Sequence, residues 1–385
     1  MGHAERGSVK TYDTIVVGAG SMGSAAIYHL ASRQRQVLGL DQFEVPNDRA
    51  AYVGVNRIIR LAYAEHPDYV PLLRRAYELW RDLERLVGER LLVITGGIDA
   101  GTAAGAIVNG SLLSCKEHNL AHEVLTATEL HRRFPGYNLP GDAIAVYQPD
   151  GGFLMSERCV VAHLNAAVAL GAEVHGRERV RGWEAFDGGV RVTTDRGSYE
   201  ARALVVTAGP WTARVVPMFA PIVVPERQVL LWADPKRPEH FQPERFPVFN
   251  MEVAEGRFYG FPVYHIPGFK IGKYHHRHER VDPDSVDRAC YPEDEEILRE
   301  AIRRYFPDAD GPTLAMKVCL FSNTPDEHFI IDTLPDAPRI VVAAGFSGHG
   351  FKFCSVVGEI VADLVVDGNT RFDLTLFRMN RSALQ

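Results

Sequence analysis

The chain has 385 residues, 46% of them hydrophobic and 24% charged, so it has enough apolar side chains for a sizeable core and is not a disordered protein. This length exceeds what one core usually organises and favours two joined domains. The formal net charge of -7 repels polyanions, so we expect no nucleic-acid partner.

The five cysteines are an odd number, widely spaced and without a CxxC pair, which is typical of a protein from a reducing compartment. No apolar stretch has the length of a membrane span or of a signal peptide. The sequence therefore predicts a cytoplasmic protein with no membrane partner.

The first predicted elements form a strand–helix–strand unit. Residues 12–20 (YDTIVVGAG) are a β-branched run that ends on glycines, residues 21–32 have helical periodicity, and residues 36–41 (QVLGLD) form a second strand. Together they span about thirty residues, the size of a parallel βαβ crossover. This pattern predicts a Rossmann-type α/β fold.

Gly18, Gly20 and Gly23 form a GxGxxG turn between the first strand and the helix. Such glycines allow a tight turn, a close approach of pyrophosphate to the backbone, and close packing of helix on strand. Asp41 ends the second strand, where a carboxylate accepts hydrogen bonds from ribose hydroxyls and disfavours the 2'-phosphate of NADP. These residues predict a dinucleotide site, and by themselves they do not distinguish FAD from NAD.

Later segments predict an interleaved second domain. Residues 69–86 form an amphipathic helix, and residues 203–209 and 339–345 are apolar runs that end on glycine, typical of buried parallel strands. Residues 223–233 and 257–272 instead alternate as in an antiparallel sheet. We assign residues 11–85, 150–215 and 325–380 to a discontinuous nucleotide-binding domain, and residues 86–149 and 216–324 to a substrate domain.

Nearly the whole chain resembles the monomeric sarcosine oxidase and N-methyltryptophan oxidase family, flavoenzymes with a glutathione-reductase-like FAD domain. The resemblance begins with YDTIVVGAGSMGSAA from Tyr12 onward. Its most specific blocks are NRIIRLAY (56–63), FYGFP (258–262), MKVCLFSNTPDEHFIID (316–332) and AAGFSGHGFKF (343–353).

The resemblance implies FAD attached covalently, through the 8α methyl group of the flavin ring, to the cysteine at position Cys319. The segment before Lys352 implies a helix start facing the pyrimidine edge of the flavin, where a helix dipole favours the anionic reduced ring. The further flavin contacts that the resemblance implies are Arg57, Ala208, Gly209, Trp211, Gly348, His349, Gly350, Phe351 and Lys352.

The resemblance also implies an amino-acid site. Arg60 matches an arginine that binds the substrate carboxylate, which a guanidinium grips through two parallel hydrogen bonds. Lys352 matches a lysine that assists this binding and lies where reduced flavin meets dioxygen. Tyr259 and His275 match residues that line the amine pocket.

Some positions depart from the family pattern. Residues 51–56 (AYVGVN) replace the Ser-His-His-Gly-type segment whose hydroxyl and imidazole groups contact the flavin in the family, and Phe321 and Asn250 indicate an altered substrate pocket. His275, His276 and His278 resemble a metal cluster. We expect no metal, because no carboxylate follows at a supporting spacing.

We predict an FAD-dependent oxidase of secondary amino acids that demethylates an N-methyl amino acid to formaldehyde, the primary amino acid and hydrogen peroxide. Its partners would be the amino acid and dioxygen, and it would act as a monomer. An alternative substrate is a cyclic imino acid, such as pipecolate or proline, or a glycated amino acid. An alternative of another class is an NAD-linked reductase or a noncatalytic nucleotide-binding module.

Overall fold

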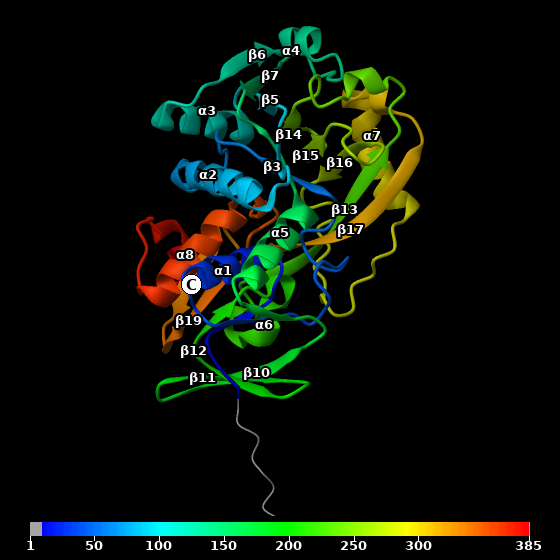
Figure 1. Ribbon diagram of the computed structural model, residues 1–385. Helices are drawn as coiled ribbons and strands as arrows, with labels where there is room; N and C mark the ends of the chain where they lie inside the picture. The colour runs from blue at the N-terminus through cyan, green and yellow to red at the C-terminus, as the bar shows by residue number, and fades with distance from the viewer. Residues whose placement is uncertain (1–9, 385) are drawn as a thin grey trace, which may run out of the picture. The chain divides into compact units, whose positions relative to one another are not determined.

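The computed structural model describes residues 10–384, and the chain passes repeatedly between two units (Figure 1). The first unit comprises Met1–Ala51, Val160–Val224 and Ser322–Gln385, and the second comprises Tyr52–Cys159 and Pro225–Phe321. Both units are therefore discontinuous in sequence. Residues 52–85, which we expected in the nucleotide-binding domain, belong to the second unit.

Parallel strands form the centre of the sheet in the first unit, in the order β19, β12, β1, β2 and β9. These strands are β1 (Lys10–Val17), β2 (Val37–Leu40), β9 (Glu173–His175), β12 (Ser198–Val206) and β19 (Ala337–Ala344). Antiparallel strands extend the sheet: β10 (Val180–Phe186), β11 (Gly189–Thr194) and β18 (Ile330–Leu334). The parallel strands predicted near residues 203–209 and 339–345 are confirmed as β12 and β19, and the structure shows that they pair with each other.

Two helices of this unit pack closely, α1 (Ser21–Ser32) and α8 (Cys354–Val366), drawn in dark blue and orange-red in Figure 1. A Cβ atom on Gly358 would lie 2.6 Å from the Cβ of Ala25, so the glycine allows this approach. The shorter α6 (Thr212–Val215) follows β12, and α5 (Ser156–Ala169) runs from the second unit into the first. Parallel strands with connecting helices confirm the predicted Rossmann-type α/β class.

The large sheet of the second unit has the order β17, β13, β16, β15, β14, β5, β7 and β6. Its pairings are antiparallel at β13–β16, β16–β15, β15–β14, β5–β7 and β7–β6, and parallel at β14–β5. The strands are β5 (Gly97–Thr102), β6 (Glu123–Thr126), β7 (Ala143–Gln148), β13 (Val224–Ala233), β14 (Val248–Val253), β15 (Gly256–Phe261), β16 (Phe269–Lys273) and β17 (Thr313–Asn323). Helices α3 (Ala106–His118), α4 (Ala127–Arg133) and α7 (Pro292–Tyr305) accompany it.

A small antiparallel sheet explains why residues 52–85 belong to the second unit. Strand β8 (Gly152–Met155) pairs with both β3 (Asn56–Ile59) and β4 (Leu92–Ile94). Between these two strands the chain forms α2 (Tyr69–Val87), whose apolar stripe is buried as predicted. Strand pairing between distant segments thus places residues 52–85 in the second unit. The helical pattern of residues 69–86 alone does not indicate to which unit they belong. Among residues 10–384, no helix combines the length and the hydropathy that crossing a membrane requires.

Candidate functional site

The glycine turn after β1 lies where side chains do not fit. Gly18 has a φ of +93°, and a Cβ atom there would lie 2.5 Å from the carbonyl oxygen of Thr207. A Cβ atom on Gly23 would lie 1.7 Å from the carbonyl oxygen of Gly18. Gly20 precedes α1, and in the described structure no side chain caps this helix start. Its N–H groups are therefore available for a phosphate, as the pyrophosphate of FAD requires.

The carboxylate of Asp41 is fixed next to the glycine turn. Its oxygens accept hydrogen bonds from the backbone N–H groups of Ala19, at 3.0 Å, and Phe43, at 2.9 Å. Burial raises the pKa of Asp41 to about 6, against the lowering effect of these two hydrogen bonds. Each oxygen keeps a second lone pair for a ribose hydroxyl, so the donor set of this turn fits the adenosine half of FAD.

The second predicted flavin segment of this unit follows β12. Gly209 begins the short 3-10 helix η1 (Gly209–Trp211) with a φ of +53°, and a Cβ atom there would meet no heavy atom within 4 Å. The backbone N–H of Trp211 donates to the carbonyl of Ala208 at 3.0 Å, and the Trp211 ring packs edge-on against Phe43. The turn is therefore well defined and has open space beside it.

The predicted segment Gly348–Lys352 lies before α8. Gly348 has a φ of +76°, and η5 (Phe351–Phe353) leads into the helix. The His349 ring pairs through Nε2 with the carbonyl of Glu327 at 2.9 Å, and Lys352 donates to the carbonyl of His349 at 2.7 Å. Lys352 is 5% exposed, so it is a buried lysine and not a surface one.

In the second unit, Cys319 on β17 lies among cations. Its thiol is free and buried. Burial raises the pKa of this thiol, and the positive charges of Arg57 and Lys270 oppose the rise. Both cations also lie close to Gly54, because a Cβ atom there would be 3.5 Å from Nη1 of Arg57 and 3.7 Å from Nζ of Lys270. Such a group of charges suits a negatively charged ring system.

Lys270 on β16 was not predicted from the sequence. Its Nζ donates to the carbonyls of Gly54 (2.6 Å) and Asn56 (2.9 Å) and to Oδ1 of Asn56 (2.8 Å). Burial lowers its pKa well below the ordinary value, and the charge of Arg57 lowers it further. The segment of residues 51–56 that departs from the family pattern is thus held by a buried lysine.

Arg60, the predicted carboxylate ligand, is 2% exposed and surrounded by acceptors. It donates through Nη1 to the carbonyl of Ala62 and through Nη2 to Glu65, at 2.8 and 3.0 Å. Arg257 donates to the same carboxylate at 2.6 Å. Nε of Arg60 has no hydrogen-bond acceptor and lies 3.6 Å from Oδ1 of Asp99. A buried N–H of this kind can bind an incoming carboxylate oxygen.

Asp99 accounts for the unexpected Asn250. Asp99 is fully buried, and it accepts hydrogen bonds from Ser111 at 2.7 Å and from Nδ2 of Asn250 at 3.2 Å. Burial raises the pKa of Asp99, and the charge of Arg60 opposes this rise. The side chain of Asn250 thus supplies a hydrogen-bond donor to a buried carboxylate, which explains a polar residue at this position.

Aromatic residues near this network gather around Tyr274, the residue before the predicted His275. The ring of Tyr274 lies 5.0 Å from that of Tyr259 and 5.7 Å from that of Phe321, and Arg257 lies over it at 4.2 Å. The structure thus brings Tyr274 beside Tyr259. The side chain of His275 pairs with Glu226 instead.

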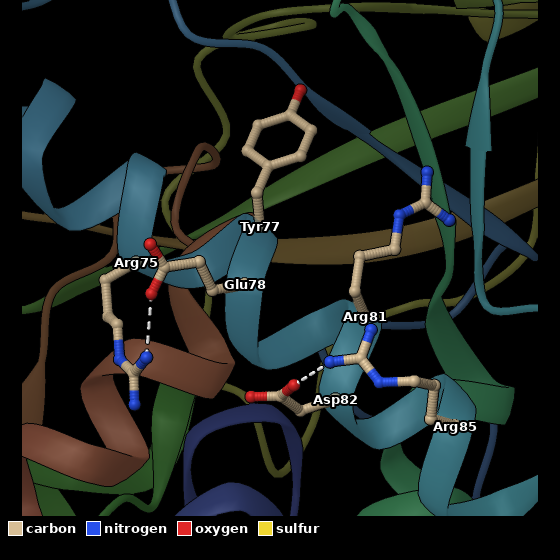
Figure 2. A pocket seen from close by; sticks show the side chains of 6 residues that line it. All are labelled: Arg75, Tyr77, Glu78, Arg81, Asp82 and Arg85. Atoms are coloured by element: carbon tan, nitrogen blue, oxygen red, sulfur yellow. Dashed lines mark hydrogen bonds and ion pairs between the residues drawn. The ribbon is translucent and has the colours of Figure 1, made fainter.

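A surface hollow on α2 contains none of these residues (Figure 2). Its arginines pair along the helix: Arg75 with Glu78, Arg85 with Asp82, and Arg81 with Glu84. The remaining lining residue, Tyr77, donates to the carbonyl of Asp150. The hollow is a solvated helix face and has no part in the site.

Comparison with known proteins gives consistent relatives. Residues 13–364 match the family model described as FAD dependent oxidoreductase. Monomeric sarcosine oxidase of Streptomyces avermitilis is 41% identical over 97% of this chain and 98% of its own length. N-methyl-L-tryptophan oxidase of Yersinia pestis is 34% identical over 96% of this chain and 99% of its own length.

Solved structures agree with the fold. The open form of NikD, an unusual amino acid oxidase essential for nikkomycin biosynthesis, superposes with a TM-score of 0.82 at 26% identity, covering 96% of this chain and 97% of that one. L-proline dehydrogenase from P. horikoshii superposes with a TM-score of 0.84 at 19% identity, covering 96% and 97%. The second likeness concerns the fold alone.

Proposed function

The chain belongs to the FAD-dependent oxidoreductase family that includes the monomeric sarcosine oxidases and N-methyl-L-tryptophan oxidases, and we propose that its substrate is an N-methyl amino acid. The predicted family and the predicted FAD-dependent amine oxidase are confirmed. This membership favours FAD over the NAD-linked alternative. The products of the proposed reaction are formaldehyde, the primary amino acid and hydrogen peroxide.

The observation that carries the proposal is the buried Arg60, whose Nε has no hydrogen-bond acceptor. A carboxylate that reaches this N–H would fix the position of the amino acid. Lys352 is proposed as a second cation for the same carboxylate. Tyr259 and Tyr274 would supply apolar walls for the substrate amine and exclude water.

When bound, FAD supplies the electron sink of the reaction, so the chain itself needs no strong acid or base at the reacting carbon. Its own residues bind and orient the substrate and set the charge around the flavin. Arg57 near Cys319 would favour negative charge on the reduced ring and on reduced oxygen. Lys270 would add to this charge in its ammonium form, which the three acceptors around its Nζ favour against burial. The resemblance implied that Lys352 lies where reduced flavin meets dioxygen, and Lys270 is a second candidate for this position.

We propose covalent attachment of FAD at Cys319. The carbon–sulfur bond would replace one C–H bond of the 8α methyl group, and the two electrons released would reduce the flavin and then pass to dioxygen. The thiolate is the attacking form of the sulfur, and the cations around Cys319 favour it against burial. Acid precipitation tests the attachment. Wild-type protein should leave yellow colour in the pellet, whereas Cys319→Ser should release all flavin to the supernatant. Colour in the pellet of the variant would refute this attachment site.

Product analysis tests the substrate class. The purified holoenzyme is incubated with sarcosine, other N-methyl amino acids, pipecolate and a glycated amino acid, and formaldehyde and hydrogen peroxide are measured. We expect both products, in equal amounts, from an N-methyl amino acid. Turnover of pipecolate without formaldehyde would replace the proposal by cyclic imino acid oxidation. Turnover without peroxide would indicate an acceptor other than dioxygen.

A further inference from the structure

Three side chains of the second unit, two of them the His275–Glu226 pair described above, bring metal-ligating atoms together. Glu226 on β13 and two residues of the loop after β16, His275 and His278, each offer a ligand atom, and these atoms lie within 4.8 Å of one another. We propose that this group, the His275 cluster, binds one divalent transition-metal ion of the Zn²⁺ type.

Two of the ligands already have the spacing of a metal-bound pair. Nδ1 of His275 lies 3.1 Å from both carboxylate oxygens of Glu226. In tetrahedral zinc sites with bonds of about 2.0–2.1 Å, neighbouring donor atoms lie about 3.4 Å apart. His278 is exposed, and its ring stacks on that of His275 with centroids 5.4 Å apart and 3° between the planes. A rotation of this exposed ring would complete the set.

The backbone of the loop that carries both imidazoles has a fixed conformation. His275 and His278 have φ values of +50° and +55°, in the left-handed region that side chains other than glycine seldom adopt. Such a conformation persists when its surroundings fix it. Here the N–H of Arg227 donates to the carbonyl of Glu279 at 2.9 Å, and the N–H of Val281 donates to the carbonyl of Pro225 at 3.0 Å.

An outer layer orients the carboxylate. Nε2 of Gln228 donates to Oε1 of Glu226 at 2.7 Å, and Oε1 of Gln228 accepts from the backbone N–H of His276 at 3.0 Å. The amide is therefore fixed from both sides, and Oε2 of Glu226 remains directed at His275. Outer hydrogen bonds of this kind are a regular feature of metal sites.

The donor set selects the ion. Two imidazoles and one carboxylate suit Zn²⁺, Co²⁺ or Ni²⁺, whereas Mg²⁺ and Ca²⁺ require mainly oxygen ligands. Three protein ligands leave a fourth position for water. We expected no metal from the sequence because no carboxylate stood at a supporting spacing from the three histidines. The structure supplies Glu226, 49 residues before His275, and His276 instead faces Asp294 at 3.3 Å.

The test is a Zn²⁺ titration of the purified, chelator-washed holoenzyme by calorimetry. We expect one ion per chain and a higher thermal unfolding midpoint with Zn²⁺, since an ion that binds the folded state stabilises it. Co²⁺ in place of Zn²⁺ should give absorption bands typical of a tetrahedral or five-coordinate ion.

Matched variants separate the cluster from other surface histidines. His275→Asn and His278→Asn remove an imidazole while keeping a residue that tolerates positive φ. The control is His265→Asn, at an exposed loop histidine of the same unit with a φ of +58° that is not part of the His275 cluster. We expect each cluster variant to weaken Zn²⁺ binding at least about tenfold, and the control to bind like wild type.

Several outcomes would overturn the proposal. Wild type that binds no Zn²⁺ would show that the cluster is only a hydrogen-bonded His–Glu pair. Equal binding by wild type and His278→Asn would place the ion elsewhere, and so would loss of binding in His265→Asn. Glu226→Gln gives a further check, because it keeps the size of the side chain and removes its charge. Undiminished binding by this variant would also contradict the site.

Discussion

The two units build their candidate binding residues in different ways. In the first, most of the candidate contacts come from the backbone: the glycines of the β1–α1 turn leave room for a phosphate, and the helix start has uncapped N–H groups. The Asp41 carboxylate lies beside them. In the second, the candidate contacts come from buried charged side chains. Arg60 pairs with the carboxylates of Glu65 and Asp99, and Arg257 pairs with that of Glu65. A site built from backbone groups should lose binding when a substitution adds a side chain. A site built from charged side chains should lose binding when a substitution removes one charge.

The largest effect should come from Gly23→Ala. The added Cβ atom would lie 1.7 Å from the carbonyl oxygen of Gly18, so helix α1 must move away from the strand. We expect a loss of at least about 3 kcal/mol of stability and of most bound FAD. Thermal unfolding and the flavin-to-protein absorbance ratio measure both.

The control for this change is Gly182→Ala in the same unit, where an added Cβ atom would meet nothing within 4 Å. This variant should keep wild-type stability and flavin content. If Gly23→Ala behaved in the same way, the turn would not depend on close backbone packing.

The next effect tests the charged site. Arg60→Gln removes the proposed carboxylate ligand and leaves Asp99 with less compensation. We expect kcat/KM to fall roughly a hundred- to a thousandfold, about 3–4 kcal/mol of binding to the transition state. Steady-state kinetics measure it, with the exposed Arg245→Gln as control. A variant with unchanged KM and kcat would exclude Arg60 as a substrate ligand.

The same contrast explains how far the sequence predicted this molecule. The glycine turn and Asp41 are local: a short stretch of chain contains the strand, the turn and the helix, so spacing alone predicts them. Lys270 gave no such signal. It stands between Phe269 and Ile271, so the alternation of apolar and polar residues predicts a solvent-exposed side chain, whereas all three residues are buried.

The rest of the second unit depends on contacts between distant segments. Asp99 and Asn250 are 151 residues apart, and their pairing follows from the parallel alignment of β5 with β14. The family resemblance pointed to His275 in the amine pocket, whereas the structure brings Tyr274 beside Tyr259. Both residues lie in the turn after β16, where His275 has a φ of +50°, so the directions of their side chains depend on the turn conformation, which sequence similarity does not determine.

A pH effect on FAD affinity should separate the two kinds of site further. Asp41 has a pKa raised to about 6, and only its ionised form accepts hydrogen bonds from ribose with both oxygens. Lowering the pH below 6 should therefore weaken FAD binding, by roughly tenfold between pH 7 and pH 5. Equilibrium binding to Cys319→Ser, which lacks the proposed covalent attachment, measures this. Cys319→Ser that also carries Asp41→Asn should bind FAD with little dependence on pH over this range, and a dependence like that of Cys319→Ser alone would contradict the assignment.

The smallest effect concerns Tyr274. Its ring lies under Arg257 at 4.2 Å and packs on Tyr259 and Phe321, so Tyr274→Leu removes a cation–π contact of about 0.5–1 kcal/mol. We expect KM to rise about two- to fivefold with little change in kcat, because the ring shapes the pocket and does not react. Tyr274→Phe keeps the ring, so its KM should stay close to that of wild type. A larger effect of this variant would assign the role to the hydroxyl.

His275→Asn, assayed with a chelator present, should change KM less than Tyr274→Leu does. The opposite order would restore His275 to the amine pocket, as the family resemblance implied.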